Sequence, residues 1–129
     1  MKYEICVGIY SGDITWVNGP FPCSVHDIEM FWSSLMTHLD RLERVEADDG
    51  YIGEAPLKVK CPKSSVNPEE TLAMQAKVRM RHETVNKRFK QWAILKQVFH
   101  HPLVKHGSVF RAIAVMTQLA IEDGEKLFD

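Results

Sequence analysis

The chain has 129 residues, of which 45% are hydrophobic and 26% charged, and a formal net charge of −1. This length and composition suit one globular domain. No run of 18 apolar residues occurs and charges interrupt the first ten positions, so we expect neither a membrane-spanning helix nor a secretory signal. The three cysteines are odd in number and far apart, which favours a reducing intracellular compartment over a disulfide scaffold.

The N-terminal part of the chain predicts a β-hairpin followed by a helix. Residues 3–10 are rich in β-forming side chains, and residues 14–17 return after a Ser-Gly-Asp turn. The Asn-Gly-Pro step at residues 18–20 is expected to end the second strand. Ser24 is the expected cap of the helix. Its inward side chains, at helical spacing, are Ile28, Phe31, Trp32, Leu35 and Leu39.

Two short strands are predicted next. Residues 44–47 predict a buried strand that ends at Asp48 and Asp49, and Gly50 predicts a turn directly after these carboxylates. Residues 57–61 predict the other strand.

A long helix and a final helix complete the predicted fold. Asn67 is the expected cap of the long helix, Pro68 its first residue and Glu70 the acid of a capping box. No proline or glycine follows until His101-Pro102, so the helix would be roughly 45 Å long at ~1.5 Å per residue. Its inward side chains are predicted to be Val85, Phe89, Trp92 and Phe99. The final helix, residues 109–121, is predicted to bury Ile113, Met116 and Ala120.

The order of these elements predicts an α/β fold in which helices flank a small sheet. Charge is distributed unevenly along it. Residues 27–54 hold eight acids and two arginines, whereas residues 77–96 hold seven basic residues and one acid, Glu83. An acidic part beside a basic part is typical of a metal-dependent enzyme acting on a polyanion, although two solvated faces would give the same pattern.

Three acidic side chains are candidates for chemistry. Asp48 ends a strand, where open α/β sheets place functional groups. Glu83 is the only acid in the basic stretch, and Asp27 lies near the start of the first helix. Each has a structural alternative, because Asp27 could be a capping-box acid, Asp48 a turn residue, and Glu83 the ion-pair partner of Lys87 or Arg79.

Together, such carboxylates would bind Mg²⁺ or Mn²⁺ for phosphoryl transfer. Arg79, Glu83, Lys87 and Lys90 are spaced by four, four and three residues, so they share one face of the predicted helix. The three cations on this face are predicted to contact DNA phosphates. The aromatic side chains at positions 89 and 92 lie off this face and are predicted to belong to the core rather than to stack on bases.

Several segments resemble a known family. In chain order they are residues 16–22 (Trp-Val-Asn-Gly-Pro-Phe-Pro), 24–27 (Ser-Val-His-Asp) and 47–51 (Ala-Asp-Asp-Gly-Tyr). They resemble the catalytic core of DDE superfamily transposases, most closely Harbinger-type elements and their bacterial insertion-sequence relatives. In that family the Asp of an Ala-Asp-x-Gly-Tyr step is the second metal-binding carboxylate, which corresponds here to Asp48.

The family's third carboxylate is a Glu on a later helix in an Arg-rich context, and it corresponds to Glu83. The bacterial relatives place an Arg four residues before this Glu and a Lys seven residues after it, which Arg79 and Lys90 match. The Tyr that they place three residues before the Arg falls on Ala76. The resemblance extends over about residues 3 to 121.

The resemblance implies an RNase H-like core, made here of a β-hairpin, a helix, a strand, a long helix and a C-terminal helix. It implies a divalent-metal-dependent DNA endonuclease or transposase, with Mg or Mn as cofactor and DNA, but no membrane, as partner. Asp48 and Glu83 would be catalytic metal ligands, Asp27 an accessory ligand, and Arg79, Lys87 and Lys90 DNA contacts. A nuclear or otherwise intracellular location follows from the same likeness.

One departure from the family concerns its first catalytic Asp, which lies on a strand ahead of the predicted hairpin. Asp13 cannot replace it, because it lies in the turn between two strands. Residues 1–129 are therefore expected to be a partial catalytic domain, incomplete unless an oligomer or an upstream segment supplies the missing strand. The alternative is a non-catalytic remnant of the same fold that binds nucleic acid or protein.

Overall fold

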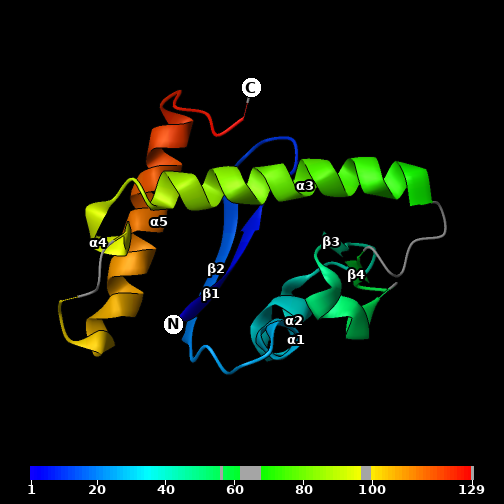
Figure 1. Cartoon of the computed structure of the whole chain (residues 1–129), viewed down its shortest axis with the longest axis horizontal. Helices are drawn as coiled ribbons and strands as arrows, with labels where there is room; N and C mark the ends of the chain where they lie inside the picture. Colours follow the sequence, from blue (N-terminus) through cyan, green and yellow to red (C-terminus); the bar gives the residue numbers. More distant parts are fainter. Residues whose placement is uncertain (56, 62–67, 97–99, 129) are drawn as a thin grey trace. The chain divides into compact units, whose positions relative to one another are not determined.

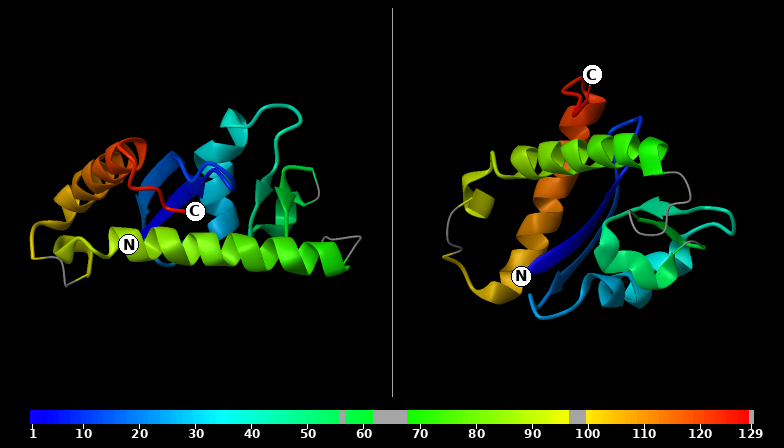
Figure 2. Two further views of the ribbon diagram at one scale, coloured as in Figure 1. Left: turned by 90° about the horizontal axis from the view of Figure 1, so that it is seen from above. Right: turned by 45° about the vertical axis from the view of Figure 1, so that its right-hand side comes forward.

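The structure is a computed structural model that describes residues 1–55, 57–61, 68–96 and 100–128 (Figures 1 and 2). By its internal contacts the chain divides into two compact units. The first unit contains residues 21–79 and Met1, and the second contains residues 2–20 and 80–129. Within the described ranges, no helix is both long and apolar enough to cross a membrane.

The second unit is built around the predicted hairpin. Strands β1 (Lys2–Val7) and β2 (Ile14–Phe21) pair in a two-stranded sheet. The loop is closed by the amide of Gly8, which donates to the Asp13 carbonyl at 2.9 Å. So short a connection excludes a parallel crossover, so the strands are antiparallel and the predicted hairpin is confirmed.

Strand β2 runs on to Phe21, so the prediction that Asn-Gly-Pro ends it is wrong. Gly19 adopts a φ of 130°, and a Cβ at this position would lie 2.9 Å from the Lys2 carbonyl oxygen. Glycine therefore lets β2 pass close to β1 where a side chain would collide. Pro20 is tolerated because both strands of a two-stranded sheet are edge strands.

Helix α5 (His106–Glu122) and the C-terminal part of α3 (Pro68–Phe89) pack against this hairpin. Their shared core is Val85, Phe89, Phe110, Ala114, Ile121 and Leu127. Tyr3 of β1 stacks on Phe110 with ring centroids 3.7 Å apart. Burial raises the pKa of the Tyr3 phenol, and the Arg111 guanidinium partly opposes this shift.

The buried face of α5 differs from the prediction. Ile113 is buried as expected, but Met116 is 42% exposed and Ala120 only half-buried. The helix instead turns inward the side chains of Phe110, Ile113, Ala114, Thr117 and Ile121. Apolar residues occur on both sides of this helix, so periodicity alone did not determine which side packs on the core.

Helix α3 begins at Pro68 as predicted but ends at Phe89, so a helix continuing to His101 is wrong. The amides of Gln91 and Trp92 bond three residues back, which tightens the chain into a turn before the short α4 (Ala93–Lys96). Because no proline or glycine stands there, we attribute the end to packing of Phe89, which meets Phe110 edge-on at 5.3 Å. The expected cap Asn67 and the expected core residue Phe99 lie outside the described residues.

The first unit begins with a helix in three parts, α1 (Asp27–Met30), a π-helical turn η1 (Phe31–Leu35) and α2 (Met36–His38). Its cap is His26, whose amide donates to the Glu29 carboxylate at 3.1 Å. The predictions of Ser24 as cap and Asp27 as capping-box acid are therefore wrong. A capping box needs its acid three residues after the cap, and Asp27 directly follows it.

The π-helical turn changes which side chains of this helix are buried. Phe31 and Leu35 are buried as predicted, together with Met30. Trp32 is 47% exposed, contrary to prediction. A π turn holds more residues than an α turn, so side chains within it do not follow the 3.6-residue period on which the prediction rested.

Strands β3 (Val45–Glu46) and β4 (Val59–Lys60) form a second, parallel two-stranded sheet, with Val45 opposite Val59. Both predicted strands are confirmed in shortened form. Val45 and Glu46 are only half-buried, whereas Val59 is fully buried. The 3₁₀ helix η2 (Asp49–Glu54) lies in the connection between them. The two units together confirm a mixed α/β fold.

Candidate metal-binding site

Asp48 stands between β3 and η2 and fixes the turn that follows. It is the N-cap of η2, and its Oδ1 accepts a hydrogen bond from the Gly50 amide at 3.0 Å. The turn role considered from the sequence is thus confirmed. It does not exclude a ligand role, because the side chain is exposed and an ionised carboxylate has about four acceptor positions.

Asp27 meets Asp48 at Gly50. A Cβ on this glycine would lie 3.0 Å from Oδ1 of Asp48 and 3.1 Å from Oδ2 of Asp27. The two carboxylates, 21 positions apart in the sequence, therefore converge on one small space that only a glycine leaves open. The capping acid of α1 is Glu29 rather than Asp27.

Two glycines allow η2 to approach the helix so closely. A 3₁₀ helix has three residues per turn, so Gly50 and Gly53 lie on the same face. Gly50 faces Asp27, and a Cβ on Gly53 would lie 3.4 Å from Ile28 Cδ1. The sequence analysis missed the role of Gly53, although the three-residue spacing of the glycines is a signal that could have indicated it.

Aromatic side chains fix the same two segments to each other. Phe31 meets Tyr51 of η2 edge-on, with ring centroids 5.9 Å apart. The indole N–H of Trp32 donates to Glu54 Oε1. These contacts hold the middle and the end of η2 against the helix that carries Asp27, so the position of Asp48 relative to Asp27 is set by packing.

Glu83 lies on α3 in the second unit, with its side chain exposed. Within the described part of the chain it forms no ion pair with Arg79 or Lys87, so the ion-pair alternative is not borne out. The structure brings Asp27 and Asp48 together inside the first unit. That Glu83 converges with them stays a prediction.

The predicted DNA contacts are all exposed. Arg79 and Lys87 lie on α3 at helical spacing from Glu83, and Lys90 is the first residue beyond the helix. The amide of Lys90 still bonds the Asn86 carbonyl at 3.0 Å, which keeps it in helical register. The shared face is confirmed for α3, whereas Trp92 is 40% exposed and not the core residue expected.

The chain was compared with models of known protein families. Residues 1–118 match the family model of DDE superfamily endonucleases. The chain belongs to this family. The match includes Asp27, Asp48 and Glu83 together with Arg79, Lys87 and Lys90, and it confirms the resemblance found in the sequence. No curated protein and no solved structure matches the chain.

The side chains that meet at Gly50 in this DDE endonuclease chain supply part of the oxygen ligands that a hard divalent cation needs. Asp27 and Asp48 supply carboxylate oxygens, the donors that Mg²⁺ and Mn²⁺ prefer. Among the described residues, no group of three or more His, Cys, Asp or Glu side chains is placed to hold a metal ion. The first unit therefore brings two carboxylates to one position.

Proposed function

We propose that this DDE endonuclease chain takes part in divalent-metal-dependent cleavage or strand transfer of DNA, with Asp27 and Asp48 as ligands of one Mg²⁺ or Mn²⁺. The convergence of their carboxylate oxygens on Gly50 carries the proposal. Mg²⁺ keeps several waters and is commonly bound through one or two carboxylates plus substrate phosphates. Two carboxylates are therefore enough for a site that also needs the DNA.

The remaining residues take roles around this pair. Glu83 is proposed as a further catalytic carboxylate of an RNase H-like fold. A bound divalent metal would polarise the phosphodiester and favour ionisation of the attacking water or 3′-hydroxyl. Arg79, Lys87 and Lys90 would hold the DNA backbone by contacts to phosphate.

In an RNase H-like fold, the small sheet of the second unit would be part of a larger sheet. In the described part of the chain this sheet has only the strands β1 and β2, so a further strand could extend it. We propose that such a strand, from another part of the same protein or from a partner, carries the remaining carboxylate. The reaction would take place in the nucleus or wherever else inside the cell the DNA lies.

The first test is calorimetric titration of the purified chain with Mn²⁺. Replacing either ligand by its amide, Asp48→Asn or Asp27→Asn, is expected to weaken Mn²⁺ binding by about tenfold or more, which is ~1.4 kcal/mol. Each substitution removes a charged ligand and keeps the size of the side chain. Far-UV circular dichroism would show that both variants stay folded.

Asp40→Asn is the matched control, because Asp40 is an exposed acid of the same unit that lies outside the Gly50 contacts. It changes the net charge equally and should leave Mn²⁺ affinity unchanged. Equal weakening in all three variants would mean diffuse attraction by the acidic unit. An unaltered affinity in Asp48→Asn would exclude Asp48 as a ligand.

A second test uses the glycine between the carboxylates. Gly50→Ala places a methyl group about 3 Å from both acidic oxygens, tighter than ordinary contact, so the carboxylates must move apart. We expect Mn²⁺ affinity to fall several-fold. Gly53→Ala is the control on the same face of η2, because its methyl would meet Ile28 at the ordinary distance of 3.4 Å. The idea fails if both variants bind Mn²⁺ like the parent chain.

A non-catalytic DNA-binding role is the second candidate, favoured by the absence of a three-ligand metal group among the described residues. It relies on the cations of α3 alone. DNA binding that depends steeply on salt, and not at all on Mn²⁺ or on Asp48, would support this role over the catalytic one.

A further inference from the structure

Helix α5 carries a second apolar face that its own unit leaves uncovered. Its inner face packs on the core, but Val115 and Leu119 on the outer face are 59% and 57% exposed. Burying such side chains stabilises an association by ~25 cal/mol for each Å² of apolar surface removed from water. An exposed apolar stripe on a helix of this length is a feature of interaction sites.

The stripe has the spacing of a coiled-coil seam. Its residues are separated by four, three, four and three positions, the 3.5-residue repeat with which two helices interlock. All of them are exposed. This outer seam of α5 consists of Ser108, Ala112, Val115, Leu119 and Glu122. Its three central members are apolar and lie three and four positions apart, which suits packing against another helix.

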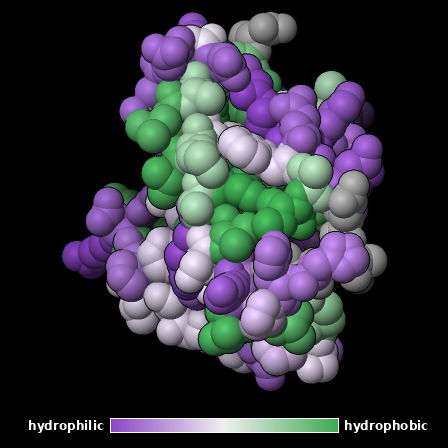
Figure 3. All heavy atoms as spheres, turned by 90° about the vertical axis from the view of Figure 1, so that its left-hand side faces the viewer, coloured by the Kyte–Doolittle hydropathy of each residue, from purple (hydrophilic) through white to green (hydrophobic). Residues whose placement is uncertain are grey.

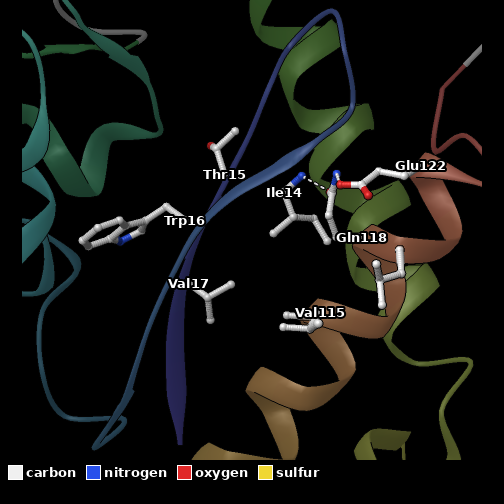
Figure 4. A pocket seen from close by; sticks show the side chains of 9 residues that line it. Ile14, Thr15, Trp16, Val17, Val115, Gln118 and Glu122 are labelled. Atoms are coloured by element: carbon white, nitrogen blue, oxygen red, sulfur yellow. Dashed lines mark hydrogen bonds between the residues drawn. The ribbon is translucent and has the colours of Figure 1, made fainter.

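A groove of about 350 Å³ runs beside the seam, between α5 and β2 (Figure 4). Val115 and Leu119 line one side of it, and Ile14 and Val17 line the other. The side of the molecule that bears α4 and α5 shows hydrophobic side chains gathered over its middle (Figure 3). The groove gives side chains of a docked helix an apolar place to enter.

The charges along α5 favour a particular partner, a second copy in the opposite direction. Arg111 is exposed before the apolar centre of the seam, and Glu122 and Asp123 are exposed after it. In an antiparallel pair centred between Val115 and Leu119, each Arg111 lies near the acidic end of the other helix. A parallel pair would place like charges together, which is destabilising.

We propose that two copies of this chain associate through the outer seam of α5 as an antiparallel, two-fold symmetric dimer. Val115 of one copy then packs against Leu119 of the other, twice, as a self-complementary interface requires. Arg111 also donates to the Gly19 carbonyl of its own chain, but a guanidinium has five donors and can serve both partners. One helix pair buries less than a standard interface, so we expect a weak, concentration-dependent dimer.

Sedimentation velocity of the purified chain over a range of concentrations tests the seam. The parent chain should dimerise as concentration rises, and the double variant Val115→Glu with Leu119→Glu should stay monomeric at every concentration. Both positions are exposed, so the fold should survive, as circular dichroism would verify. Met116→Glu is the control, because Met116 is exposed on α5 but off the seam; it should dimerise like the parent chain.

Charge reversal tests the direction independently. Glu122→Arg with Asp123→Arg should weaken the dimer at least tenfold, and adding Arg111→Glu should restore it. A parent chain that stays monomeric at all concentrations overturns the proposal, as does a dimer that survives the seam substitutions. Failure of the charge restoration overturns the antiparallel arrangement. None of these outcomes depends on Mn²⁺ or DNA, so they leave the proposed function untouched.

Discussion

Replacing Phe31 by Ala is expected to destabilise the first unit by about 3–5 kcal/mol, the usual cost of removing a buried Phe side chain. Phe31 is fully buried and contacts Tyr51 of η2. Its loss leaves a cavity and also removes a contact that holds η2 against the helix carrying Asp27. Mn²⁺ affinity should therefore fall even under conditions in which the variant remains folded. Urea denaturation and Mn²⁺ titration measure the two effects separately.

Two controls separate burial from side-chain chemistry. Phe31→Leu retains an apolar side chain of similar bulk and should cost less than Phe31→Ala. Leu42 is 91% exposed in the same unit, so Leu42→Ala should change the free energy of unfolding by less than about 0.5 kcal/mol. A loss of stability at Leu42 as large as that at Phe31 would contradict the assigned core.

The local parts of the proposed metal site were predictable from the sequence. The Asp-Asp-Gly step predicted a turn, and Asp48 does cap η2 and bind the Gly50 amide. Asp27 was predictable only as a candidate ligand. Its position next to Asp48 depends on packing between segments that are distant in the sequence. The sequence favoured Ser24 as the cap, yet the chain enters the helix two residues later at His26. That shift removes Asp27 from the capping box.

The wrong predictions of buried faces have a common physical origin. Periodicity locates a core face only if the helix is regular and apolar on one side. The π-helical turn at Phe31–Leu35 breaks the first condition and exposes Trp32. Helix α5 breaks the second, because Val115 and Leu119 give it an apolar outer face. This outer face made the buried side of α5 ambiguous, so Met116 was wrongly assigned to the core. The proposed dimer gives the outer face a function.

Reversing the charge of Lys87 on α3 and of Lys90 directly after it should nearly abolish DNA binding. The double variant Lys87→Glu with Lys90→Glu removes two proposed phosphate contacts. It also lowers the net charge of the surface proposed to face the DNA backbone by four. Each phosphate contact adds about 0.9 to the slope of log affinity against log salt, so the slope should fall by roughly 1.8. Fluorescence anisotropy with labelled duplex DNA, measured at several salt concentrations, gives both the affinity and the slope.

Lys96→Glu with Lys126→Glu provides the matched control, because both lysines are exposed in the same unit but off this face of α3. It alters the net charge by the same amount and should leave most of the affinity and the slope intact. Equal losses in the two variants would mean that only total charge attracts DNA, and the α3 face would lose its role. Mn²⁺ binding should be unchanged in both, since neither variant alters Asp27 or Asp48. A variant that binds Mn²⁺ but not DNA would therefore separate metal binding from substrate binding in this endonuclease chain.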